Sequence, residues 1–419
     1  MPSKPSLDRW PLIYSQSSPV PHVATCSILQ KAASGCTCSA LHHTTMGSKS
    51  SAMEGLVLCL VAISVQVLVV AGVHRRPPAL YVFGDSILDV GNNNYLPGED
   101  VPRANRPYYG IDFPGMIPTG RFSNGYNTAD YLAKSMGFVV SPPPHLSLPP
   151  TTSSLVALTA GGVSYASASA GILDSTNAGK CAPLSRLVEY FNATRAKMVA
   201  AVGSGAVDAL LLKSIFLLGV GSNDLFVFAA AQQSRNRTPA ERQSDAAALL
   251  ADLLSNYSAT ITDLHAMGAR KFAITNLGLL GCVPALRALD PAGACVDGLN
   301  QLAAGFNDAL RSLLAGLAPR LPGLVYSLAD SFSLTRDTFA DPQASGYTDI
   351  AGACCGSGRL LAEGDCLPNS TVCSSRDQHV FWDRYHPSQR ASLLTAQAFY
   401  DGPAQYTTPI NFMQLAQSS

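Results

Sequence analysis

The chain has 419 residues, of which 47% are hydrophobic and only 13% are charged. This length and composition allow one large folded domain with a full hydrophobic core. The 28 basic and 28 acidic residues give a formal net charge of +0, which does not supply the basic footprint that nucleic-acid binding requires. The Cys and His residues lack zinc-type spacing. We therefore expect no nucleic-acid partner, no metal and no cofactor.

The first part of the chain differs in composition from the rest. Residues 1–52 are rich in Ser, Pro and Thr and show no sustained periodicity. This pattern favours a disordered leader, or an over-extended gene model whose true initiation is at Met46 or Met53.

An apolar run follows this leader. Gly55–Val73 is long enough to span a bilayer, but it also has the character of a signal-peptide core. We expect a signal peptide over 53–76, with a retained membrane anchor as the alternative, and a single folded domain over 77–419. After signal cleavage we expect no stable membrane insertion.

Short apolar runs alternate with Ala- and Leu-rich stretches that have helical spacing. Strands are expected at Leu80–Phe83, near Val163–Tyr165, and at Ile215–Val220, Lys271–Thr275 and Gly323–Leu328. Helices are expected at Tyr126–Met136, Leu184–Ala201, Pro239–Met267, Gly298–Leu317 and Ser388–Tyr400. This alternation predicts an α/β fold in which helices cover both faces of a parallel sheet, a three-layer α/β/α sandwich.

A possible nucleophile lies at the end of the first expected strand. Ser86 closes the tripeptide Gly84-Asp85-Ser86, and near the other end of the expected domain Asp383 precedes His386 by three positions. A serine hydroxyl needs an adjacent base, and that base needs a group to orient it. We expect Ser86, His386 and Asp383 to take these three roles. The alternatives are an N-cap serine without chemistry and an ordinary surface Asp–His contact.

A possible oxyanion donor follows the third expected strand. Asn223 lies in Gly221-Ser222-Asn223-Asp224, directly after an apolar run. Its side-chain amide can donate to a tetrahedral oxyanion. The alternative is a turn-forming Asn at a strand end. Asp224 is expected to support this loop. No G-x-S-x-G elbow is present, which argues against the larger α/β-hydrolase fold.

These motifs, in this order, resemble the plant secreted branch of the GDSL esterase/lipase family of SGNH hydrolases. The resemblance extends from about Ala79 to about Pro403. It implies a flavodoxin-like sheet with five parallel strands and hydrolysis of a carboxylic ester through an acyl-enzyme. It also implies an ester of an acyl lipid, an acetylated polysaccharide or a cell-wall phenolic as substrate. The supporting segments are Asp89–Asn94, Gly120–Gly125, Gly162–Gly171 and Thr275–Pro284.

The second oxyanion donor is where this chain departs from the family pattern. Within Gly162–Gly171, Ser164 replaces the usual Asn and Ser169 occupies the position of the usual Gly. Because a backbone N–H would donate there, Ser169 can serve if its backbone conformation is accessible. Gly171 is the alternative donor.

Other functions remain open at this stage. An acyltransferase would use the same acyl-enzyme, a catalytically silent cell-wall binding protein could use the same scaffold, and an uncleaved Gly55–Val73 would give a membrane-anchored hydrolase. We expect a monomer.

Two further features favour secretion into the extracellular space or cell wall. Seven cysteines lie in the expected folded domain, and in an oxidising compartment they could pair. Cys282 with Cys295 would close a short loop, Cys354 or Cys355 could pair with Cys366 or Cys373, and at least one thiol is left over. Four glycosylation acceptors occur, at Asn192, Asn236, Asn256 and Asn369.

Overall fold

The computed structural model describes residues 76–149, 161–235 and 237–418. The expected leader and apolar run therefore lie outside the described residues, as does Asn236. Among the described helices, none combines the length and the apolar character needed to cross a membrane.

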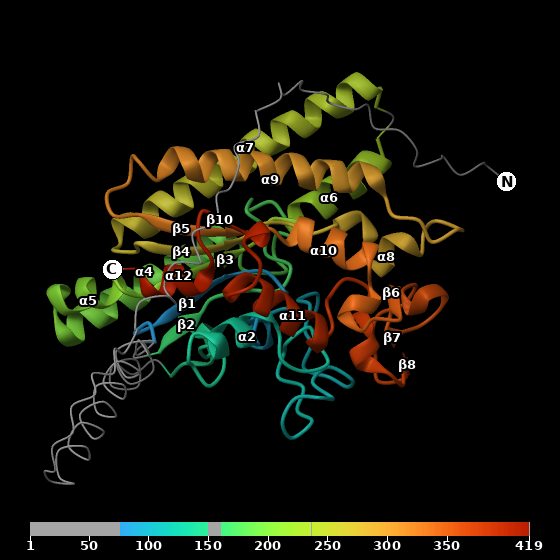
Figure 1. The fold of residues 1–419 in the computed structure, drawn as a ribbon, viewed down its shortest axis with the longest axis horizontal. Helices are drawn as coiled ribbons and strands as arrows, with labels where there is room; N and C mark the ends of the chain where they lie inside the picture. Colours follow the sequence, from blue (N-terminus) through green and yellow to red (C-terminus); the bar gives the residue numbers. More distant parts are fainter. Residues whose placement is uncertain (1–75, 150–160, 236, 419) are drawn as a thin grey trace, which may run out of the picture. The chain divides into compact units, whose positions relative to one another are not determined.

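A six-stranded sheet with the order β10-β5-β4-β3-β1-β2 forms the centre of the fold (Figure 1). Five neighbouring strands run parallel, as expected, and their order 2-1-3-4-5 is that of flavodoxin-like sheets. The short strand β10, which the sequence did not predict, is added antiparallel to β5 at the edge. The strands are β1 (Leu80–Gly84), β2 (Gly162–Ser164), β3 (Ile215–Gly219), β4 (Lys271–Thr275), β5 (Val325–Ala329) and β10 (Thr407–Thr408).

Helices cover both faces of this sheet, which confirms the three-layer prediction (Figure 1). Successive strand residues point to opposite faces, so Tyr81 and Phe83 belong to one core cluster and Leu80 and Val82 to the other. The first face packs against α4 (Leu184–Val202), α5 (Ser204–Leu211), α7 (Pro239–Ala266) and α9 (Asp297–Leu317). The second packs against α2 (Thr128–Ser135), α11 (Gln389–Tyr400) and α12 (Phe412–Gln417).

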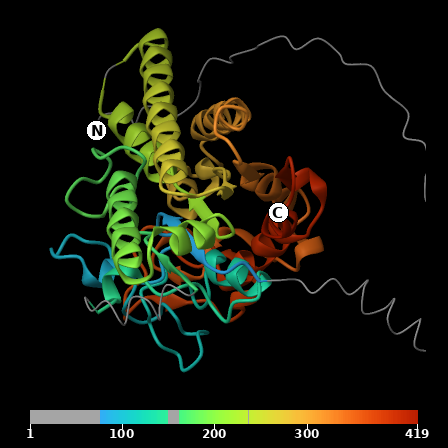
Figure 2. The same cartoon turned by 90° about the vertical axis from the view of Figure 1, so that its left-hand side faces the viewer.

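The longest of the described helices, α7, is the long yellow-green helix in Figure 2. A sequence signal fixes its first residue. Thr238 accepts a hydrogen bond from the backbone N–H of Glu241, and the Glu241 carboxylate accepts from the backbone N–H of Thr238. Pro239 occupies the first helical position, where its missing N–H costs nothing. The expected start at Pro239 is confirmed.

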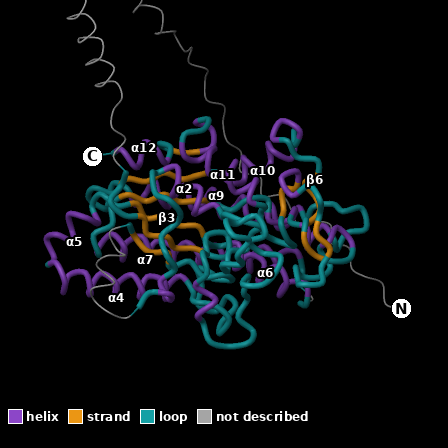
Figure 3. The backbone as a smooth tube through the Cα atoms, turned by 90° about the horizontal axis from the view of Figure 1, so that it is seen from below, coloured by secondary structure: helices purple, strands orange, loops and turns teal. Residues whose placement is uncertain are grey.

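Loops gather at the carboxyl ends of the parallel strands (Figure 3). Two small sheets lie among them, β6 (Asp349–Ala353) with β9 (His379–Phe381), and β7 (Cys355–Gly356) with β8 (Thr371–Val372). The remaining helices there are α6 (Ser222–Gln233), α8 (Pro284–Arg287) and α10 (Ser331–Ala340).

Three disulfides hold this loop region together. Cys282 pairs with Cys295, as expected, and Cys354–Cys373 and Cys355–Cys366 resolve the pairing that the sequence left open. Among the described cysteines, Cys181 carries a free thiol.

Candidate active site

Ser86 lies in the turn that follows β1, at the carboxyl edge of the sheet. Gly84 permits this turn, because a Cβ there would come within 2.6 Å of the Gly219 carbonyl oxygen on the neighbouring strand β3. The N–H of Asp85 donates to that same oxygen at 3.2 Å. The Ser86 hydroxyl oxygen then lies 2.8 Å from Nε2 of His386, although the two residues are 300 positions apart in the chain.

His386 is held on its other side by Asp383. Its Nδ1 lies 2.7 and 2.8 Å from the two carboxylate oxygens of Asp383. Oδ1 of Asp383 also accepts hydrogen bonds from the backbone N–H groups of Tyr385 and His386, each at 2.9 Å. The structure thus brings the three expected residues into a continuous Ser–His–Asp chain of hydrogen-bonding contacts.

Asp383 is buried, with 3% of its surface exposed, and burial alone would raise its pKa. Its contact with His386 and the hydrogen bonds that it accepts outweigh burial, so the pKa of Asp383 lies below its ordinary value. Asp383 is therefore an anion at neutral pH, as a group that orients an imidazole must be.

Two aromatic residues complete the surroundings of this pair. The Tyr109 hydroxyl donates to Oδ2 of Asp383 at 2.7 Å, and the ring of Phe122 packs against His386 with centroids 4.7 Å apart. The sequence carries no signal that selects Tyr109 as the partner of Asp383, because the two are 274 positions apart.

The turn that carries His386 is fixed by neighbouring backbone and side chains. The N–H of Trp382 donates to the His386 carbonyl oxygen at 2.8 Å. Directly after it, Ser388 caps α11 by accepting from the N–H of Ala391. The N–H of Gln389 donates to the side-chain oxygen of Asn124 at 2.7 Å. The imidazole is therefore presented by a rigid turn at the start of a helix.

The small residues of Gly162–Gly171, which include β2, are held in place by polar side chains of Asp89–Asn94. Asp89 accepts hydrogen bonds from the N–H groups of Gly91, Asn92 and Ala168. The amide of Asn92 donates to the carbonyl oxygens of Ser164 and Ala166. These contacts explain why the two segments occur together in the sequence, since one positions the backbone of the other.

Ser169 adopts the backbone conformation that a glycine would take without cost. Its φ angle is +68°, in the left-handed region. A serine therefore occupies the conformation expected at the family's glycine position. At the alternative position, Gly171, a Cβ would meet the Thr176 side chain at 2.4 Å and Asp224 at 2.6 Å, so the close packing there requires a glycine.

Asn223 lies in the first turn of α6 and faces the same loop. Its amide nitrogen donates to the Ala170 carbonyl oxygen at 3.0 Å. The neighbouring Asp224 supports the loop, as expected, by accepting from the N–H groups of Ile172 and Leu173 and from the Thr176 hydroxyl.

A cavity of about 860 Å³ brings these groups together, with Ser86, Ser169, Asn223 and His386 in its wall. The backbone N–H groups of Ser86 and Ser169 donate no hydrogen bond to any residue that the structure describes. One amide hydrogen of Asn223 is also left over after its bond to Ala170. Residues in the wall of one cavity therefore offer these three unused donors and the serine hydroxyl.

Asp85, directly before Ser86, gives a testable pH dependence. Burial raises the pKa of Asp85 from 3.8 to about 6, against a hydrogen bond from the N–H of Ile87 and the nearby His386. Between these two pH values the folded chain binds more protons at Asp85 than the unfolded chain does, so stability falls as pH rises through this window. Asp85→Asn removes this titration. We therefore expect the stability of the variant minus that of wild type to be larger at pH 7 than at pH 4. The rise of the Asp85 pKa by about two units limits this change in the free energy of unfolding to about 3 kcal/mol.

Thermal unfolding of both proteins at several pH values measures this effect. A difference between the two melting temperatures that stays constant from pH 4 to pH 7 would contradict it.

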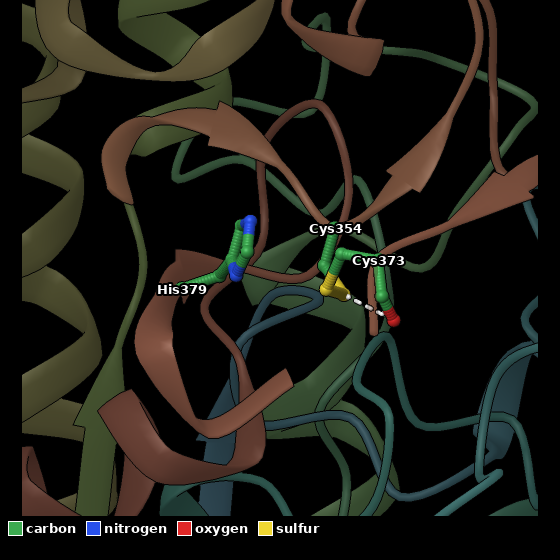
Figure 4. Close-up of side chains that lie close together, drawn as sticks. All are labelled: Cys354, Cys373 and His379. Atoms are coloured by element: carbon green, nitrogen blue, oxygen red, sulfur yellow. Dashed lines mark hydrogen bonds between the residues drawn. A yellow bond between two sulfur atoms is a disulfide. The ribbon is translucent and has the colours of Figure 1, made fainter. Parts of the chain in front are cut away.

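A separate group of possible metal ligands lies in the disulfide region. Ligand atoms of Cys354, Cys373 and His379 lie within 4.8 Å of one another (Figure 4). The two cysteines form a disulfide, so neither offers a thiolate, the form of cysteine that binds metal. In the oxidised protein this group is a packed disulfide with a neighbouring imidazole.

A three-layer α/β/α fold with Ser, His and Asp at the carboxyl edge of a flavodoxin-like sheet is the arrangement of SGNH hydrolases. Residues 80–399 match the family model described as GDSL-like Lipase/Acylhydrolase. Among Arabidopsis thaliana proteins, GDSL esterase/lipase At5g55050 is 36% identical over 81% of this chain and 90% of its own length. GDSL esterase/lipase At1g71250 is 39% identical over 82% of this chain and 90% of its own length. The chain belongs to the GDSL esterase/lipase family and is a carboxylic ester hydrolase of that family.

Proposed function

We propose that this protein hydrolyses carboxylic esters through an acyl-enzyme on Ser86, with His386 as general base and Asp383 as the group that orients it. The observation that carries the proposal is the pair of contacts on the imidazole, 2.8 Å from Nε2 to the Ser86 hydroxyl oxygen and 2.7 Å from Nδ1 to Asp383. Both lie within the range for proton transfer along hydrogen bonds.

Each half of the reaction moves one proton through His386. As the Ser86 oxygen bonds to the ester carbonyl carbon, its proton passes to Nε2, and the carbonyl oxygen becomes an oxyanion. The bond to the alcohol then breaks, and His386 returns the proton to the leaving oxygen. A water molecule repeats both steps on the acyl-enzyme, which releases the acid and restores Ser86.

The oxyanion would be stabilised by the three unused donors, which are the N–H groups of Ser86 and Ser169 and the amide of Asn223. Such donors act most strongly when they are fixed before the charge develops. Here Asp224 and Asp89 support this preorganisation by fixing the loop on either side of Ser169.

Turnover of p-nitrophenyl acetate and butyrate by wild type and Ser86→Ala tests the assignment. We expect wild type to turn over both esters and the variant to lose at least about 10³-fold in kcat. A fluorescent organophosphonate should label wild type once, within the peptide that contains Gly84–Ser86. Equal turnover by the two proteins, or a label elsewhere in the chain, would overturn the proposal.

We also propose that the protein is secreted, with cleavage near the end of the 53–76 segment. The three disulfides support this, because such bonds persist in oxidising compartments. The acceptors Asn192, Asn256 and Asn369 are exposed and accessible to glycans. N-terminal sequencing of protein from the culture medium should begin close to residue 77, and mass spectrometry of its peptides should show a glycan on at least one acceptor. A mature start before residue 50 would contradict this.

A further inference from the structure

A second cavity of about 510 Å³ lies beside the one that contains Ser86. Residues from the ends of β3 and β4, from α10 and α11, and from β9 form its wall. The two cavities share part of their lining, including the residues directly before and after Ser86 in the chain. The shared residues are Asp85, Ile87, Ser222, Leu280, Val283 and Tyr385.

Apolar side chains line much of both cavities, but the cavities differ in their charged groups. The first carries charges of both signs, among them Glu99, Asp100, Arg103, Arg106, Asp365 and Arg384. Among the described residues, the second has no cationic side chain in its lining. Its charged residues are Asp85, Asp337 and Asp341, and its apolar residues include Leu88, Leu277, Leu334, Phe339, Val380 and Leu394. Its exposed lining residues Asp341 and Ala344 indicate where it opens to solvent. Its volume is in the range of sites that enclose most of a small ligand.

Given the reaction proposed above, the position of His386 decides which arm of an ester enters which cavity. His386 must return a proton to the leaving alcohol oxygen, so the alcohol must lie on the side of the imidazole. His386 lines only the first, charged cavity. The acyl chain has to leave Ser86 in another direction, and Ile87, the next residue in the chain, lines both cavities.

We propose that the second cavity binds the aliphatic acyl chain of the substrate, while the first binds a polar alcohol. Ile87, Val283 and Tyr385 line both cavities and would border the acyl chain where it passes from one to the other. The Tyr385 ring packs edge-on against Phe226 with centroids 5.6 Å apart and remains 39% exposed. The substrate class is therefore an ester of a medium-length fatty acid with a polar alcohol, and this assignment rests on the function proposed for Ser86.

The acyl chain length of p-nitrophenyl esters tests this directly, because the leaving group stays constant. Each methylene that is buried in an apolar cavity should raise kcat/KM about fourfold. We expect kcat/KM to rise in this way from acetate through butyrate and hexanoate to octanoate. A flat profile would overturn the proposal.

Two variants block the second cavity from opposite walls. Thr338→Trp on α10 and Thr395→Trp on α11 replace half-buried lining residues with a bulky ring. Ala340→Trp and Gln397→Trp place the same ring at exposed positions of the same helices that line neither cavity. The melting temperatures of all four show whether each variant folds.

We expect the blocking variants to keep acetate turnover within about twofold of wild type and to lose at least tenfold of kcat/KM on octanoate. The controls should retain the wild-type profile. Wild-type behaviour of both folded blocking variants on octanoate would overturn the proposal. Acetate esters of n-alkyl alcohols of increasing length lengthen the alcohol instead of the acyl chain. If the blocking variants lost activity only on these esters, the second cavity would hold the alcohol and the proposal would be overturned. Absence of Ser86-dependent acetate turnover in wild type would instead refute the function on which the proposal rests.

Discussion

Asp383→Asn is expected to lower kcat about 10⁴-fold while the protein remains folded. In the wild-type site, Oδ1 of Asp383 accepts from the N–H groups of Tyr385 and His386. These donors would keep the amide oxygen of an asparagine at the Oδ1 position. The amide NH₂ group would then occupy the Oδ2 position, which lies 2.8 Å from Nδ1 of His386.

That exchange would reverse the polarity of the contact with the imidazole. An NH₂ group can only donate, so Nδ1 would have to accept, and the ring hydrogen would move to Nε2. Nε2 could then no longer accept the proton of Ser86. Steady-state kinetics with p-nitrophenyl butyrate measures the loss, and thermal unfolding checks the fold.

Asp377→Asn serves as the matched control. Asp377 is an exposed carboxylate that lines neither cavity. Its replacement should leave kcat close to that of wild type. A near-normal kcat for Asp383→Asn would show that another group, such as a backbone carbonyl, orients His386.

The sequence was sufficient to predict the five parallel strands, because these depend on local patterns. Ser86, His386 and Asp383 were expected to meet because together they supply the three groups that a serine hydrolase needs. Apolar runs with a polar residue at their end mark buried parallel strands and the edge where ligands bind. All five parallel strands lie within about two residues of their predicted positions.

The features that the sequence did not reveal depend on contacts made by the fold. Helix α10 has no fully buried residue, so it carries no strong apolar periodicity, and its start is set by the Asp330 side chain. Tyr109 could not be told apart from neighbouring aromatics until the fold placed it against Asp383. The left-handed conformation of Ser169 likewise arises from the hydrogen bonds around it, not from a propensity of serine.

Asn223→Ala is expected to lower kcat by about 10² to 10³-fold with little change in KM. The charge that the amide would stabilise develops only in the transition state, so its removal should affect the chemical step more than substrate binding. The amide of Asn223 has one hydrogen bonded to the Ala170 oxygen and one left for the oxyanion.

A purely structural role of Asn223 would give a different result. The Ala170–Thr176 loop is also held by Asp224, through the N–H groups of Ile172 and Leu173 and the Thr176 hydroxyl. These bonds remain in Asn223→Ala, so the loop should stay in place and the melting temperature should change little. Asn223→Asp keeps the shape of the side chain but replaces the donor with an anion that repels the oxyanion.

The aspartate variant should therefore be at least as slow as the alanine variant. Ser234→Ala, at the exposed end of the same helix, should behave like wild type. If Asn223→Ala raises KM without lowering kcat, the amide contributes only to binding. The backbone N–H groups of Ser86 and Ser169 would then have to stabilise the oxyanion without it.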